Sequence, residues 1–464
     1  MRFLLSVKLR RYFNYLLIML LRYLTLLTLL GLLTGCSTSS VFMPYPARAL
    51  SYQQALATGT IQPALEANKK LLNRKDALLA LLEQGRMQQL AGDYTASKQS
   101  FTLALAKLDA IDQRATISLS HTASQGTALV SNDNTIPYQS HDYERIFVHQ
   151  FQALNYIALG DKESALVEMR RAQFFQDKNP ENINDTSSQA LSDNALNEYQ
   201  NRFSATNDLA QRVKSSRQNA YVLYLAGVLY ESKKQFDDAY IDYKRALSIA
   251  PDNRFLQEDV ARLAKQLNRV EDLKNLSKIK FTSPKANEGT VVVLYEEGFV
   301  PAKKELFLPF PWPETWYTVA FPYYGDAWQS PIALNINAIN SQVITDTQAL
   351  AARALQDNFV PMLIRQTLRA QTKHKMQQEA QNQGGLALGL LVGAYNFLSE
   401  NADLRSWLTL PRFAHIARFN LSVGEQSLSL NNGQTLKISV QNQRITLVRI
   451  VNINEHFYVA SWPL

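Results

Sequence analysis

The sequence predicts an α+β protein: an N-terminal, all-α array of helical repeats, then a β-rich C-terminal domain with a helical insert. Apolar residues recur with the period of a helix over 51–278. Within this region similar units follow one another, which is typical of a repeat architecture. From about Phe281 the chain is β-branched and aromatic, with Gly and Pro at the boundaries, as in strands.

Residues 1–35 predict a signal peptide. This segment holds five basic residues and no acidic residue, and its apolar core is Tyr23–Leu33. Met1 and Met19 are both possible starts. A membrane-spanning anchor over Tyr12–Leu33 is the alternative, but Arg22 lies in the middle of that run, where a charge is costly.

The single cysteine, Cys36, directly follows the apolar core. Leu33-Thr34-Gly35-Cys36 resembles the lipobox of bacterial lipoproteins. The resemblance implies cleavage before Cys36, a diacylglycerol on its thiol and acylation, for example by palmitate, of the new amine. Several acyl chains together give stable anchoring. In the Gram-negative lipoproteins that the segment resembles, Asp at the next position usually retains the protein in the inner membrane. Ser37 therefore favours the outer membrane, with the chain facing the periplasm.

Residues 36–50 are predicted to be a tether, followed by the repeat domain over 51–278. Its clearest unit, 220–253, places small, aromatic and proline residues at the spacing of a helix pair, and it resembles a tetratricopeptide repeat. The matching positions are Gly227, Tyr230, Ala239, Tyr243, Ala246 and Pro251. Weaker copies precede it, with Gly92-Asp93 and Gly160-Asp161 at the turns between helices. Polar inserts interrupt the array near 113–141 and 179–219.

The β-rich domain is predicted over 281–464, with a helical insert near 347–400. Strands are expected in "GTVVVLYEEGFV", "WYTVAFPYY", "QTLKISV", "RITLVRIV" and "HFYVASW", one long helix over 347–383, and a turn at Asn431-Asn432-Gly433. As a whole the chain resembles a family of Gram-negative tetratricopeptide-repeat lipoproteins with a β-rich C-terminal domain. "YERIFVHQFQALNYIALGD" and "ADLRSWLTLP" carry that resemblance, which supplies no established activity.

No catalytic constellation emerges from the sequence. Ser277–Lys280 matches S-x-x-K and Ser192–Asn194 matches S-D-N, but their order is reversed and no K-T-G follows. The six histidines have no metal-ligand spacing. We therefore expect no enzyme activity, no catalytic residue, no metal and no cofactor. The net charge of +8 lies partly in the signal peptide, and the lack of a basic stripe excludes nucleic acid as a partner.

The function that the sequence favours is a scaffold that binds an envelope protein or peptide segment and recruits or regulates envelope machinery. Stacked repeats form a groove lined by the first helix of each pair. The repeat geometry predicts as partner-binding residues Arg86, Gln89, Gln150, Tyr224 and Glu231. An insert such as 113–141 could instead fill the groove.

Two further hypotheses concern the C-terminal domain. The alternative function is a glycan-acting or glycan-binding protein that uses the aromatic and carboxylate region 296–328, with Glu296, Glu297 and Asp326 as candidate acids. Gly385, Gly389 and Gly393 have the four-residue spacing of a helix contact, which predicts a buried helix, self-association or membrane insertion.

Overall fold

The computed structural model describes residues 43–120, 136–177, 202–312, 315–382 and 401–464, with positions 360, 363–365, 367–368, 370–371, 373 and 380 left out. The chain divides into two compact units, Met1–Arg48 and Ala49–Leu464. The predicted signal peptide, the predicted lipidation site Cys36 and the glycines at 385, 389 and 393 lie outside the described residues.

Three helix pairs form the repeats. They are α5 (Ala77–Leu90) with α6 (Tyr94–Ser120), α7 (Asp142–Ala158) with α8 (Lys162–Asp177), and α11 (Ala220–Ser232) with α12 (Phe236–Ile249). α12 ends just before Pro251, which cannot continue a helix. The helix pair predicted over 220–253 is therefore confirmed.

A glycine allows close contact within the first and third pairs. A Cβ on Gly85 would lie 2.6 Å from the Phe101 ring, and one on Gly227 would lie 2.5 Å from the Tyr243 ring. The large ring of the second helix thus fills the space that a side chain on the first would need. The first and third pairs therefore share the same close contact between a glycine and an aromatic ring.

Further helices flank the repeats: α3 (Tyr45–Thr58), α4 (Gln62–Lys69), α10 (Ser204–Ala210), α13 (Arg254–Gln266) and α14 (Val270–Asn275). α3 begins inside the region predicted as a tether over 36–50, so the boundary of that tether is corrected to before Tyr45. α6 extends into the first predicted insert, and α10 lies in the second.

The strands are β1 (Glu288–Glu297), β2 (Lys304–Trp312), β3 (Thr315–Tyr323), β4 (Asn335–Ile336), β5 (Ile339–Asn340), β6 (Gln342–Asp346), β7 (Phe413–Ser422), β8 (Gly424–Ser429), β9 (Thr435–Val440), β10 (Ile445–Ile453) and β11 (His456–Pro463). Five of them form the main sheet in the order β11-β10-β1-β7-β6. β1 pairs in parallel with β10 and antiparallel with β7. β2 with β3 and β8 with β9 form separate two-stranded sheets, the second joined at the predicted turn around Gly433.

The long helix expected over 347–383 is interrupted. α15 covers Thr347–Asp357, begins where the Asp346 carboxylate accepts a hydrogen bond from the Ala349 N–H, and ends at Asn358. The described residues between 359 and 382 are again helical. The helical insert therefore consists of at least two segments.

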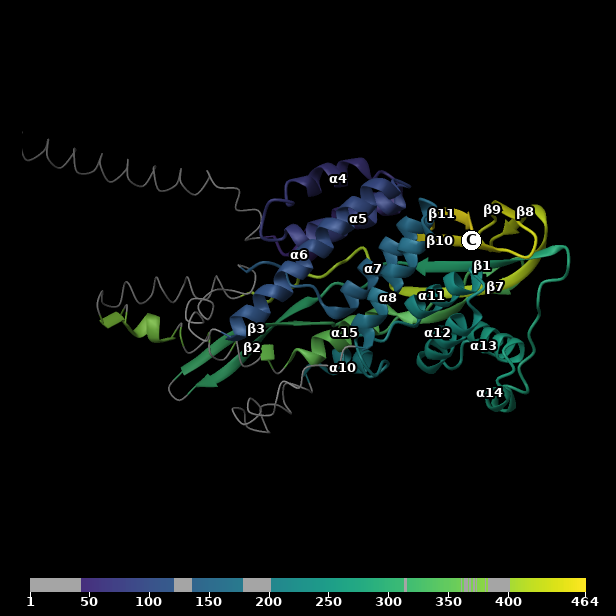
Figure 1. The fold of residues 1–464 in the computed structure, drawn as a ribbon. Helices are drawn as coiled ribbons and strands as arrows, with labels where there is room; N and C mark the ends of the chain where they lie inside the picture. The colour runs from purple at the N-terminus through teal and green to yellow at the C-terminus, as the bar shows by residue number, and fades with distance from the viewer. Residues whose placement is uncertain are drawn as a thin grey trace, which may run out of the picture. The chain divides into compact units, whose positions relative to one another are not determined.

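One face of the main sheet packs on the repeats. Successive side chains of a strand point to opposite faces, so in β1 Glu296 points one way and Glu297 the other. Glu296 bonds to Arg86 of α5, whereas Glu297 bonds to His415 of β7. Figure 1 shows the repeat helices α11 and α12 near strands β1 and β7, and hydrogen bonds join α11 to both strands. The C-terminal domain and the repeats thus share one interface. No helix in the described part of the chain is long and apolar enough to cross a membrane.

Candidate functional site

The candidate site is the inner face of the repeats, which we define as the sides of α5, α7 and α11 that face the main sheet. All five predicted partner-binding residues lie on these helices. Arg86, Gln89, Gln150 and Tyr224 are buried, and the side chain of Glu231 is only 9% exposed. These residues are therefore covered by other parts of the same chain, which are described below.

At α5 the inner face carries a buried ion pair. The Arg86 Nη2 donates to the Glu296 Oε2 of β1, and the Arg449 Nε of β10 donates to the Glu296 Oε1 at 2.9 Å. The Tyr221 hydroxyl of α11 donates to the same carboxylate at 3.1 Å. Gln89 extends the network, since its Oε1 accepts from the Arg449 Nη1 at 2.9 Å.

The electrostatics of this ion pair follow from burial and charge. Burial acts to raise the pKa of Glu296, but the charges of Arg449 and Arg86 outweigh it and lower the pKa to about 2. Burial lowers the pKa of Arg86 to about 10, against the opposing charge of Glu296. Glu296 therefore stays ionised and is neutralised by two arginines.

A second ion-pair network covers α11. Glu231 accepts from Arg418 Nη2 of β7 at 2.7 Å, from Arg262 Nη1 of α13 at 2.8 Å and from the Tyr243 hydroxyl at 2.8 Å. Burial would raise the pKa of Glu231, but the charges of Arg418 and Arg262 lower it to about 2. Tyr224 lies behind this network, where its hydroxyl donates to the Asp259 carboxylate at 3.3 Å.

Gln150 of α7 differs from the other four residues. It is fully buried, and neither its Nε2 nor its Oε1 has a hydrogen-bond partner in the described part of the chain. Its neighbour His149 bonds to Glu168 of α8 at 2.7 Å, within the second repeat. The binding of a separate partner by the five predicted residues remains a prediction.

A segment outside the helices and strands, residues 402–410 (ADLRSWLTL), covers the inner face at α5 and α7 and turns at Leu408 and Thr409. We call it the occupying segment. It has no regular secondary structure, and the repeats bind its main chain through side chains. The Trp407 N–H donates to Glu144 Oε1 at 2.7 Å, and the Leu408 N–H donates to Glu83 Oε1 at 2.9 Å. These contacts resemble the recognition of a peptide by a protein.

The carbonyl groups of the occupying segment are bound as well. Gln53 Nε2 of α3 donates to the Leu408 carbonyl at 3.0 Å, and Arg86 Nε donates to the Thr409 carbonyl at 3.3 Å. The Thr409 hydroxyl donates to Glu83 Oε2 at 2.5 Å. Glu83 thus binds both a main-chain and a side-chain donor of the segment.

Trp407 is the apolar centre of the segment. Its side chain is 0% exposed and packs between Phe101 of α6 and Phe151 of α7, with ring centroids 5.8 and 5.6 Å away. The indole N–H donates to the Thr409 hydroxyl at 3.0 Å. The ring of Trp407 is therefore packed against other aromatic rings, and its N–H has a hydrogen-bond acceptor.

Arg405 secures the other end of the segment. It donates to Asp76 at 2.8 Å and to the Ile136 carbonyl at 3.0 Å, and it pairs with Asp403 at 2.7 Å. Lys303 Nζ donates to the Arg405 carbonyl at 2.9 Å. Burial, together with the charge of Lys303, lowers the pKa of the adjacent His141 to about 4, so that His141 is neutral here.

Glu83 and Glu144 were not predicted as site residues. A signal was present at Glu83, which directly follows the apolar run 77–82 on a predicted repeat helix, whereas Glu144 has the charged neighbours Asp142 and Arg145. Glu83 and Glu144 are both 0% exposed, and buried carboxylates require partners. An acidic residue at an inward-facing position of a repeat helix therefore predicts that a hydrogen-bond donor from another part of the chain lies against it.

The carboxylates of the glycan hypothesis do not form an acid pair. Glu296 is neutralised under the repeats, Glu297 lies on the opposite face of β1, and Asp326 pairs with Lys304 in an exposed position. Glycoside hydrolysis needs two carboxyl groups flanking one bond. No group of three His, Cys, Asp or Glu side chains in the described residues could hold a metal ion.

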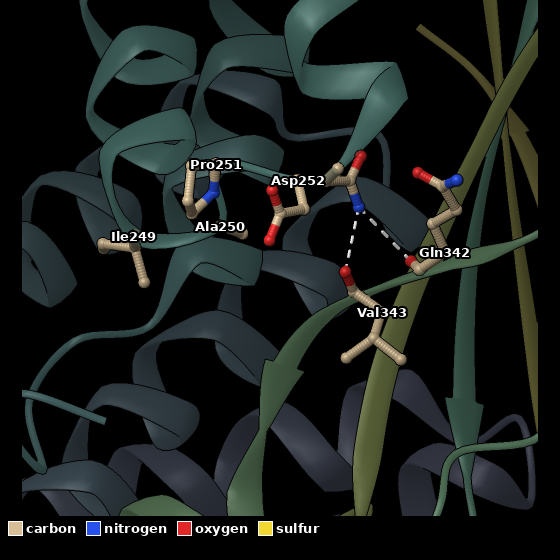
Figure 2. A pocket seen from close by; sticks show the side chains of 7 residues that line it. Ile249, Ala250, Pro251, Asp252, Gln342 and Val343 are labelled. Atoms are coloured by element: carbon tan, nitrogen blue, oxygen red, sulfur yellow. Dashed lines mark hydrogen bonds between the residues drawn. The ribbon is translucent and has the colours of Figure 1, made fainter. Parts of the chain in front are cut away.

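An open pocket of about 390 Å³ lies between the turn after α12 and the edge strand β6. Figure 2 shows Pro251 and Asp252 of the turn facing Gln342 and Val343 of the strand. The Asn253 Nδ2 donates to the Val343 carbonyl at 2.9 Å, so the turn covers part of the sheet edge. The pocket therefore serves as a junction between the repeats and the sheet.

The helix pairs and their covered inner face define a protein that contains tetratricopeptide repeats. The family model described as "Tetratricopeptide repeat" matches residues 220–253. Among solved structures the chain is similar to the "Crystal structure of MamA protein", with 13% identity and a TM-score of 0.29, over 52% of this chain and 89% of that chain. A likeness at that TM-score supports no functional conclusion. The comparison with curated proteins gives no match.

Proposed function

We propose that the protein is a lipid-anchored scaffold at the periplasmic face of the outer membrane that binds an extended protein segment on the inner face of its repeats. The observation that carries this proposal is the occupying segment. Its main chain is bound by Glu83, Glu144 and Arg86, which belong to repeat helices. Such a surface is suited to a peptide rather than to a small apolar ligand.

The tetratricopeptide match supports the protein-binding part of the proposal, because such repeats serve as interaction surfaces. The anchor rests on the resemblance of Leu33–Cys36 to a lipobox, and the outer membrane rests on Ser37. Anchored in this way, the scaffold recruits or regulates envelope machinery.

The anchor is tested by metabolic labelling with radioactive palmitate. The wild-type chain is expected to incorporate label and to fractionate with the outer membrane. The Cys36→Ser variant is expected to incorporate none, whereas Ser37→Asp should keep the label and move to the inner membrane. Equal labelling of wild type and Cys36→Ser would contradict lipidation at this residue.

The partner is tested by photocrosslinking in living cells. A crosslinker at Gln53, which borders the occupying segment, is compared with one at Leu103, which is 57% exposed on α6. A protein adduct from Gln53 is the expected result. Adducts from neither position would contradict the scaffold proposal, and an adduct from Leu103 alone would place the partner on the outer helices.

A further inference from the structure

We infer that the occupying segment is an internal ligand of the repeats, and that the partner displaces it with an extended segment of the same pattern: Arg, any residue, Trp, an apolar residue and Thr or Ser. This inference deepens the proposed function and rests on it. It names the chemistry of the partner and the competition that regulates access to the site.

The contacts to the main chain do not depend on the rest of the chain. The repeats bind the N–H groups of Trp407 and Leu408 and the carbonyl of Thr409, and Gln53 of α3 binds the carbonyl of Leu408. These are main-chain groups, which every peptide carries. A segment of another protein that takes the same course, with its turn at the positions of Leu408 and Thr409, can therefore make the same four bonds.

The side-chain contacts set the pattern. The site between Phe101 and Phe151 takes an indole ring, and Glu83 requires a hydroxyl two positions after the tryptophan. Two positions before the tryptophan, Asp76 together with the Ile136 carbonyl takes a guanidinium. An apolar peptide without these groups would lose the bonds that Glu83 and Asp76 make to the segment.

The occupying segment can leave without opening the main sheet. Residues 401–409 belong to no helix or strand, and β7 starts only at Phe413. The chain is fixed to the sheet region from Leu410 on, because the Val300 N–H donates to the Leu410 carbonyl and the Arg412 N–H donates to the Glu297 carbonyl. By contrast, Arg418 lies within β7, so its pairing with Glu231 cannot be released without disturbing that strand.

Loss of the segment removes bonds from the buried side chains of Glu83, Glu144 and Arg86, and a ligand with matching donors and acceptors restores them. Such a ligand therefore favours release of the internal segment. Only chains whose inner face is free of the internal segment can bind that ligand, so the apparent affinity is the intrinsic affinity multiplied by the fraction of such chains. A substitution that weakens the internal segment increases this fraction and should raise the apparent affinity by the same factor.

The test measures binding of a fluorescein-labelled synthetic peptide, ADLRSWLTL, to the full-length protein in detergent micelles by anisotropy. Thr409→Val and Trp407→Ala weaken the internal segment, and both variants are expected to bind the peptide at least tenfold more tightly than the wild type. Thr435→Val, an exposed threonine on β9, is the matched control and should keep the wild-type affinity. A peptide with Ala in place of Trp should bind none of the proteins.

Several results would overturn the inference. One is that the folded variants, checked by a cooperative melting curve, bind the peptide no better than the wild type. Others are equal binding of the Ala peptide, or dimers of the variants in sedimentation, which would mean that a second copy fills the site. If Trp407→Ala does not fold, Thr409→Val decides the result. A crosslinked partner at Gln53 together with failed peptide binding would leave the scaffold intact and refute only this inference.

Discussion

The inner face of the repeats is covered in two different ways. At α5 and α7 the occupying segment is bound through its main chain and through the side chains of Arg405, Trp407 and Thr409. At α11 and α13 the cover is strand β7, bound through side-chain ion pairs between Arg418, Glu231 and Asp259. The first kind of contact can be reproduced by a separate peptide, whereas the second belongs to the sheet itself. Ion pairs hold the domains together, and the occupying segment is the exchangeable part.

The largest loss of stability is expected from a substitution of Glu296, whose carboxylate joins strands β1 and β10 to α5. Glu296→Gln leaves Arg86 and Arg449 buried without a counter-charge, and breaking such a pair costs about 5 kcal/mol. Chemical denaturation should show this loss in the free energy of unfolding. Glu288→Gln, at the half-buried start of β1, is the matched control. Equal stability of the two variants would mean that the ion pair contributes nothing.

Trp407→Ala tests the apolar centre of the occupying segment. Removing a fully buried indole is expected to cost about 3–5 kcal/mol. Trp462→Ala in β11, where the ring is partly exposed and meets Tyr94 at its edge, should cost clearly less. If urea denaturation ranks the two variants in the opposite order, Trp407 is not the anchor of the segment.

Acid should loosen the interface through Glu296. Its pKa is lowered from 4.5 to about 2 in the folded protein, so the unfolded state binds the proton first as the pH falls. The associated stability, about 3 kcal/mol, is present above pH 4.5 and is lost between about pH 4.5 and 2. Denaturation at stepwise pH should show a smaller loss over this window in Glu296→Gln. An identical pH profile in both proteins would contradict the assignment.

The smallest change in stability is expected from substitutions in the turns between repeat helices. Gly92 and Gly160 have φ of +82° and +81°, whereas Lys234 takes the equivalent turn at +62°. Because a side chain is unfavourable there, Lys234→Gly should stabilise the protein by about 0.5–1 kcal/mol. Gly92→Lys, the reverse change, should destabilise it by a similar amount. Thermal melting that moves both variants in the same direction would refute this explanation.

Much of the fold could be predicted because its signals are local. Gly227, Tyr243 and Pro251 fall within one helix pair, and the alternation in β10 and β11 reflects two adjacent strands. The pairing of β1 with β10 could not be predicted, since parallel neighbours lie far apart in the chain. The repeat positions Arg86 and Glu231 were identified as inward-facing, but their partners Glu296 and Arg418 follow from no local pattern.

The occupying segment was hidden for a similar reason. Residues 402–410 have no periodicity, and the bond from the Leu408 N–H to Glu83 joins residues 325 positions apart. The stretch "ADLRSWLTLP" stood out only by resemblance. Its role becomes visible once the buried acids of α5 and α7 are seen to need donors.

Native-state hydrogen exchange tests the central claim most directly, because it measures the opening free energy of each amide. The amides of Trp407 and Leu408 are expected to exchange through a local opening, at a lower free energy than the amides of Val292 and Leu294 in β1. Added ADLRSWLTL peptide should speed their exchange and leave that of β1 unchanged. Exchange of all four amides only on global unfolding, with or without peptide, would contradict the account, because the segment would then be a fixed part of the core.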